Sequence, residues 1–104
     1  MKPGSRDKSY PILITGQELE ELKELTYMMA EAFGLDGRVE RYQGKRTIGF
    51  YRWDLDCLED VLSIGVGELR DEVGEPSPRY QALASLYERI KIFRAKAYRD
   101  MGRN

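Results

Sequence analysis

The sequence predicts an α+β domain in which a small antiparallel sheet packs against three helices, in the order β-α-β-β-α-α. Three observations lead to this fold class. In three segments apolar residues recur every three or four positions, the spacing that places them on one face of an α-helix. Two other segments, 10–14 and 38–53, are short and rich in aliphatic and aromatic residues, which is typical of strands. Glycine and proline separate these segments, and the length of 104 residues suits a single domain.

The chain is expected to begin with a tail and a strand. Residues 1–9 are polar and charged, so we expect a flexible tail followed by one domain that spans 10–104. Residues 10–14 form an apolar run of strand length. Pro11 cannot donate a ladder hydrogen bond, which limits this strand to the start or the edge of a sheet.

The first helix is predicted to follow directly. Thr15 and Glu18 have the spacing of a capping box, with Thr15 as the N-cap and Glu18 at N3. The apolar stripe of this helix consists of Leu19, Leu22, Thr26, Met29 and Phe33. Gly34 suits the position after the last helical turn, so we expect the helix to end there.

Residues 38–53 are predicted to form a β-hairpin. Segments 38–42 and 46–53 contain branched and aromatic residues, and Gly44 lies in the short connection between them. A hairpin alone is marginally stable in water. The strand at 10–14 would stabilise it by joining as a third strand.

A second helix is predicted after the hairpin, with Asp54 as its cap. Its apolar stripe consists of Leu55, Leu58, Leu62, Val66 and Leu69. Gly65 and Gly67 lie in its interior, where each costs about 1 kcal/mol relative to alanine. This helix therefore either packs closely against a neighbour at its small residues or breaks near Ser63.

The third predicted helix is the longest. Ser77 suits its N-cap and Pro78 its first turn, and we expect it to run from about 78 to 100. Its broad apolar stripe consists of Leu83, Leu86, Tyr87, Ile90, Phe93 and Ala97.

Composition excludes several kinds of chemistry. The chain has no histidine, which excludes a Ser-His-Asp or Cys-His nucleophile and imidazole metal ligands within one chain. The single cysteine, Cys57, cannot form an intramolecular disulfide. No apolar run approaches the roughly 18 residues of a membrane span, and the N-terminus lacks the apolar region of a signal peptide. We therefore expect a soluble, cytoplasmic protein that is not an enzyme, uses no cofactor and does not bind a membrane.

The formal net charge of −1 conceals a strongly polarised chain. Segments 1–15, 16–37, 38–53, 54–75 and 76–104 carry net charges of +2, −5, +4, −7 and +5. Opposite faces of the domain are therefore expected to carry opposite potentials, which favours a protein partner. Three amphipathic helices and so small a sheet also leave apolar helix surface over, so we expect a homodimer that covers it.

Two basic regions are candidates for binding a partner. The predicted hairpin interleaves arginines with aromatics, and one face of the last helix is basic. The candidate residues are Arg41, Arg46, Arg52, Tyr51, Arg89, Lys96, Arg99 and Arg103. Binding of a protein by charge complementarity is the leading hypothesis, and binding of nucleic acid through cations and stacked aromatics is the alternative. A solvated basic surface over core aromatics is the structural alternative to both.

Four carboxylates follow the hairpin closely and are weak candidates for a metal site. They are Asp54, Asp56, Glu59 and Asp60. A hard cation such as Mg²⁺ prefers carboxylate oxygens, but acids in a first helical turn also complement the helix dipole. We therefore interpret the cluster as structural and predict no metal.

Overall fold

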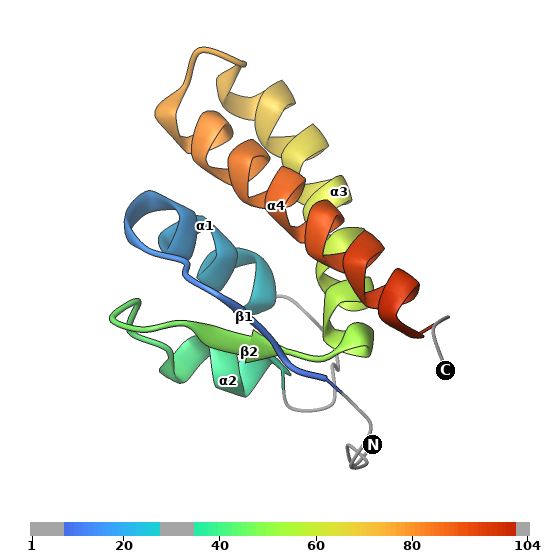
Figure 1. Ribbon diagram of the computed structural model, residues 1–104. Coiled ribbons are helices and arrows are strands. Elements are labelled where there is room, and N and C mark those ends of the chain that lie inside the picture. Colours follow the sequence, from blue (N-terminus) through green and yellow to red (C-terminus); the bar gives the residue numbers. More distant parts are fainter. Residues whose placement is uncertain (1–7, 28–34, 102–104) are drawn as a thin grey trace.

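The computed structural model describes residues 8–27 and 35–101. Within these residues the order of elements is β1-α1-α2-β2-α3-α4. Their bounds are β1 Tyr10–Ile12, α1 Gly16–Tyr27, α2 Leu35–Arg41, β2 Ile48–Phe50, α3 Arg52–Val73 and α4 Pro78–Met101. The long helices α3 and α4 lie side by side, α1 packs against them, and α2 and the sheet lie at one end of this pair (Figure 1). The fold is thus mainly helical, with a small antiparallel sheet.

The hairpin predicted over 38–53 is wrong. Residues up to Arg41 belong to helix α2, and only 48–50 form a strand, which pairs with β1 in the register Tyr10 with Phe50 and Ile12 with Ile48. The described residues therefore contain one helix more and one strand fewer than predicted. Leu35 and Val39 of α2 are four positions apart and both fully buried. This spacing places them on one face of a helix, but residues four positions apart also share one face of a strand, so the pattern over so short a segment does not decide between the two.

The strand predicted at the start of the domain is confirmed as β1. Tyr10 and Ile12 are buried while Pro11 between them is exposed, the alternation of a half-buried strand. The predicted tail lies mostly in residues 1–7, outside the described residues. The hydroxyl of Tyr10 donates a hydrogen bond of 2.6 Å to Asp100 of α4, and its ring meets Phe93 edge-on at 6.5 Å. These contacts join the start of the chain to its last helix.

Helix α1 begins at Gly16, where the backbone has a φ of +57°. Leu19, Leu22 and Thr26 of the predicted stripe are buried, while Met29, Phe33 and Gly34 lie outside the described residues. The carboxylate of Glu18, which was expected to cap the helix, contacts Arg89 of α4 instead.

Helix α3 is continuous through both of its interior glycines. It begins at Arg52, two residues before the predicted cap, with Tyr51 as N-cap and Asp54 at N3, where the carboxylate accepts the Tyr51 N–H at 2.9 Å. A Cβ at Gly65 would lie 2.8 Å from both terminal methyls of Leu25 in α1, whereas a Cβ at Gly67 would meet nothing within 4 Å. Gly65 therefore permits close packing of α1 on α3, and Gly67 does not serve this purpose.

Helix α4 confirms the prediction for the last helix. The Ser77 hydroxyl accepts the Arg79 N–H at 3.2 Å, and the helix begins at Pro78. Leu83, Leu86 and Ile90 of its stripe are buried against the rest of the chain. Because the monomer covers this stripe, the apolar argument for a homodimer loses its support, and the homodimer itself stays a prediction.

The large apolar side chains exposed among the described residues are Leu13, Ile64 and Ile92. The helices in this part of the chain are each too short or too polar to cross a lipid bilayer.

The Tyr10 hydroxyl predicts a loss of stability at high pH. Burial, together with the hydrogen bond to Asp100 and its charge, raises the pKa of Tyr10 from 10.0 to about 12. Between these values the unfolded chain releases the phenolic proton and the folded chain retains it, so stability falls as the pH rises. We expect the wild type to lose more stability than Tyr10→Phe over this range, as measured by urea unfolding. Parallel pH profiles for the two proteins would contradict this assignment.

The two interior glycines of α3 predict different changes in stability for the same substitution to alanine. Gly67→Ala should raise the free energy of unfolding by about 0.5 to 1 kcal/mol, because alanine favours the helix and meets no neighbour. The change in the free energy of unfolding for Gly65→Ala should be about 1 kcal/mol less favourable than for Gly67→Ala, because the Leu25 side chain must leave its rotamer. Thermal and urea unfolding of the two variants measure this difference. Equal stabilisation would show that Leu25 does not pack on Gly65.

Candidate binding surface

Two arginines of basic α4 form ion pairs with acidic α1. Arg89 contacts Glu18 at 2.7 Å and donates to the carbonyl of Leu13 at 2.8 Å. Arg79 donates through Nε to Glu21 at 3.0 Å, and Glu21 is only 5% exposed. The hydrogen bond from Arg79 to Glu21 raises the pKa of the guanidinium, as does the charge of that carboxylate. Part of the charge alternation in the sequence is therefore neutralised within the monomer.

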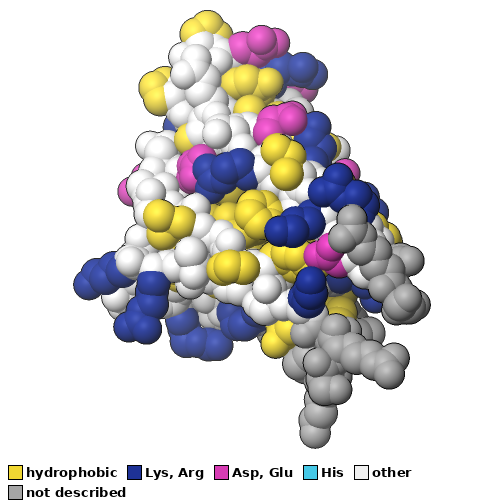
Figure 2. Space-filling model, viewed as in Figure 1, with side chains coloured by type: hydrophobic (Ala, Val, Ile, Leu, Met, Phe, Trp, Pro, Cys, Tyr) yellow, Lys and Arg dark blue, Asp and Glu magenta, His cyan; other side chains and the backbone are white. Residues whose placement is uncertain are grey.

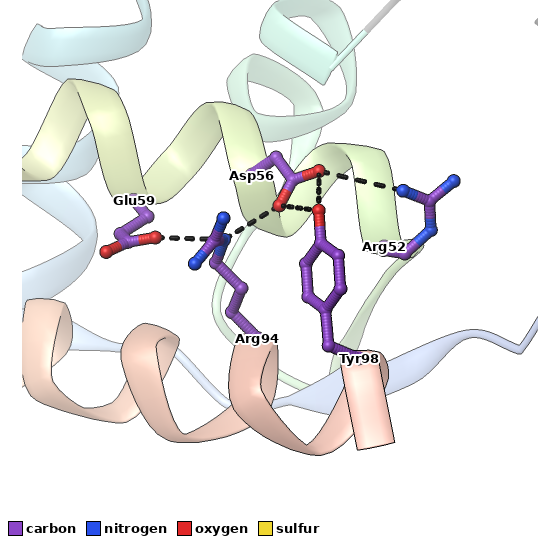
Figure 3. Close-up of polar contacts among 5 residues, drawn as sticks. All are labelled: Arg52, Asp56, Glu59, Arg94 and Tyr98. Atoms are coloured by element: carbon purple, nitrogen blue, oxygen red, sulfur yellow. Dashed lines mark hydrogen bonds and ion pairs between the residues drawn. The ribbon is translucent and has the colours of Figure 1, made fainter. Parts of the chain in front are cut away.

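A second cluster joins α4 to acidic α3 (Figure 3). The Asp56 carboxylate accepts hydrogen bonds from Arg94 Nε at 2.7 Å and from the Tyr98 hydroxyl at 2.8 Å. Arg94 also contacts Glu59 at 2.9 Å, and Arg52 approaches Asp56 at 3.9 Å. Both arginines lie over the ring of Tyr98, with guanidinium carbons 4.9 Å and 5.7 Å from its centroid. This cluster fastens the first turns of α3 to the last turns of α4.

The four carboxylates considered as metal ligands do not converge. Asp54 is buried and binds Arg38, Asp56 and Glu59 bind Arg94, and Asp60 is exposed. Within residues 8–27 and 35–101 no group of three or more acidic or thiol side chains is arranged to hold a metal ion. Arginine side chains thus neutralise Asp54, Asp56 and Glu59.

Further positive side chains lie around a hollow beside α2 and β2. Helix α2, the loop 42–47 and strand β2 enclose an open pocket of about 400 Å³. Its lining residues are Arg38, Arg41, Tyr42, Arg46, Thr47, Ile48 and Gly49, and we call it the basic pocket. In the space-filling view, Lys and Arg side chains gather over α2 and this loop (Figure 2). The acidic side chain of Glu40, also on α2, is exposed and does not line the pocket.

Local contacts fix the frame of the basic pocket. Arg38 donates through Nη1 to the Gly49 carbonyl at 3.0 Å and through Nη2 to Asp54. The Tyr42 hydroxyl accepts the Ile14 N–H at 3.3 Å and donates to the Arg46 carbonyl. Helix α2, β2 and the intervening loop are therefore held to each other and to the segment after β1.

The structure brings together only two of the predicted partner-binding residues. Arg41 and Arg46 line the basic pocket, are exposed, and make no ion pair with any residue that the structure describes. The other five described candidates lie outside the basic pocket. Arg52 and Arg89 form ion pairs with acidic side chains, and Tyr51 stacks on Trp53 with ring centroids 5.0 Å apart. Lys96 and Arg99 are exposed on α4. Arg103 lies outside the described residues.

Sequence reasoning missed Arg38, Tyr42 and Thr47 as members of the pocket. The spacing of Leu35 and Val39 is compatible with a helix, which places Arg38 and Arg41 on neighbouring positions of its surface, but it is equally compatible with a strand and gave no decisive signal. A search against family models, curated proteins and solved structures found no match to this chain.

The two carboxylates that contact Arg79 predict unequal contributions to stability. Glu21 is 5% exposed, whereas the Glu24 side chain is 71% exposed and lies 3.5 Å from the same guanidinium. We expect Glu21→Gln to lower the free energy of unfolding by about 1 kcal/mol, since it leaves a partly buried arginine without its charged acceptor. Glu24→Gln should cost less than about 0.5 kcal/mol, as is usual for exposed ion pairs. Urea unfolding compares them directly, and equal effects would contradict the role of Glu21.

Proposed function

We propose that this protein is a binding module that engages an acidic segment of a protein partner in the basic pocket. The observation that carries this proposal is that Arg38, Arg41 and Arg46 line one open hollow. Arginine suits such a role because its planar fork donates several hydrogen bonds to an anionic group. The basic face of α4, by contrast, uses Arg89 and Arg94 to hold the fold together.

A binding role rather than catalysis is supported by the state of the reactive side chains. Burial, together with the charges of Asp60 and Asp54, raises the pKa of Cys57, which keeps the thiol protonated and poorly nucleophilic near neutral pH. The Tyr98 hydroxyl donates to Asp56, which Arg94 also holds. Each of these groups serves the packing of α3 against its neighbours.

An acidic protein segment suits the pocket better than a nucleic acid does. The basic pocket is a small hollow, whereas nucleic-acid sites extend along several phosphates. The sequence pI is about 5.5, and α3 exposes Asp60, Glu68, Asp71 and Glu72, which would repel a long polyanion. Of the aromatic residues expected to form a platform on the hairpin, Phe50 is fully buried, Tyr51 stacks on Trp53, and only Tyr42 lines the pocket.

One observation keeps nucleic acid as a second candidate. The Tyr42 side chain lines the pocket next to the arginines, so a base could stack there beside a bound phosphate. This candidate predicts affinity that falls steeply with salt.

Binding of labelled acidic probes tests the proposal. The probe is a fluorescein-labelled peptide of about twelve residues that alternates glutamate pairs with serine, and oligonucleotides of similar length replace it in parallel measurements. We expect the peptide to bind the wild type and Arg41→Glu/Arg46→Glu to weaken binding at least tenfold, about 1.4 kcal/mol. The matched control is Lys96→Glu/Arg99→Glu, which changes the net charge equally on α4 and should leave the affinity within about threefold.

Three outcomes would contradict the proposal. Equal loss in both double variants would show that the probe responds to net charge alone. Tighter binding of the oligonucleotide, with a steep salt dependence, would favour nucleic acid instead. Absence of binding to either probe would remove the pocket as a binding surface.

The homodimer is tested separately by light scattering at low and high salt. A dimer that Arg41→Glu/Arg46→Glu dissociates would make a second copy of this chain the acidic partner, with exposed acids of α3 as its contact. A monomer at both salt concentrations would contradict the homodimer.

A further inference from the structure

We propose that the basic pocket receives a phosphoryl group, so that the partner segment is recognised when one of its side chains is phosphorylated. This inference rests on the proposed function, because it specifies which anion of the partner enters the pocket.

Arg38 forms a fixed wall of the pocket. Two of its N–H groups are held by the Gly49 carbonyl and the Asp54 carboxylate, while its side chain remains one third exposed. Asp54 is 1% exposed and is itself held by the Tyr51 N–H at 2.9 Å. The guanidinium is therefore oriented before a ligand arrives, and it has further N–H donors beyond the two used in these contacts.

Arg41 and Arg46 supply charge that the monomer does not neutralise in its described part. Arg41 folds back over Gly37, where an added Cβ would lie 3.2 Å from Nη1. Arg46 extends from a loop whose backbone is tied down by the Tyr42 hydroxyl. Gly44 within this loop has a φ of +74°, and a Cβ there would lie 3.2 Å from the Ile14 carbonyl. Both arginines thus project from ordered backbone.

The balance of charge favours a dianion over a carboxylate. Three guanidinium groups and the engaged Asp54 leave an excess of two positive charges at the pocket. A phosphoryl group carries about −1.5 to −2 charges near pH 7 and offers three acceptor oxygens, which is as many as the arginines that line the pocket. A glutamate carboxylate carries one charge and two oxygens, so one arginine would stay unmatched.

The size of the pocket points to a phosphorylated side chain. At about 400 Å³ the pocket is larger than a phosphate ion, and Tyr42 and Ile48 add apolar surface to its lining. The carbon atoms of the residue that carries the phosphate can pack on that surface while its oxygens reach the arginines. Recognition of phosphorylated segments by arginine clusters follows the same physical logic.

The test compares three fluorescein-labelled peptides that are identical and acidic except at the central residue, which is phosphoserine, glutamate or serine. We expect the phosphoserine peptide to bind the wild type at least tenfold more tightly than the glutamate peptide. Arg46→Gln should reduce this preference to less than about threefold. Lys45→Gln removes the same charge from the neighbouring residue, which does not line the pocket, and should keep the preference. Circular dichroism confirms that both variants are folded.

The outcomes separate this inference from the proposed function. Equal affinity for the phosphoserine and glutamate peptides overturns the phosphoryl inference and leaves the acidic-partner proposal standing. Absence of binding to all three peptides overturns both. A third case is distinguished by titrating inorganic phosphate alone into the protein. The backbone amide chemical shifts of residues 37–49 report its binding. Shifts with phosphate but no peptide binding would support the phosphoryl site and overturn the protein partner, since a small phosphorylated molecule would then be the ligand.

Discussion

The buried carboxylate of Asp54 is the interaction on which the architecture of this protein depends most. It accepts the Tyr51 N–H at the start of α3 and binds Arg38 of α2, which in turn donates to the Gly49 carbonyl of β2. Three consecutive elements, α2, β2 and α3, are therefore joined through Arg38 and a carboxylate that is 1% exposed. A charge so deeply buried is tolerated only when its hydrogen bonds are satisfied, so these elements must assemble together.

The alternation of charge along the chain has an explanation in the topology. Acidic α1 and α3 both pack against basic α4, and Arg79, Arg89 and Arg94 each bind an acid from one of these helices. Most of these side chains are partly exposed, so each pair contributes modestly to stability. Their combined effect is to favour this arrangement of helices over others in which like charges would face each other.

The sequence predicts the three longer helices well because their apolar periodicity extends over several turns, as it does from Leu55 to Leu69. It fails over 38–53, where a helix of one to two turns and a three-residue strand are too short for period to decide between them. The candidate site divides in the same way. Arg41 and Arg46 are identified as candidates because a segment rich in arginine indicates an exposed basic surface without knowledge of the fold. The ion pair of Arg89 could not be predicted because its acceptor, Glu18, lies 71 positions earlier, and no local pattern reveals such a contact.

A surface that binds by charge must keep charges that the fold does not neutralise, and this requirement distinguishes the basic pocket from the rest of the molecule. On α4 the arginines that face a neighbouring helix meet carboxylates, and the fold gains from each contact. At the pocket, Arg38 binds Asp54, whereas Arg41 and Arg46 make no ion pair within the described residues. An anion bound there would offset the repulsion among these like charges, so ligand binding and stability would be linked at this site. Arg38 thus serves the fold, while Arg41 and Arg46 keep the charge that the proposed partner would meet.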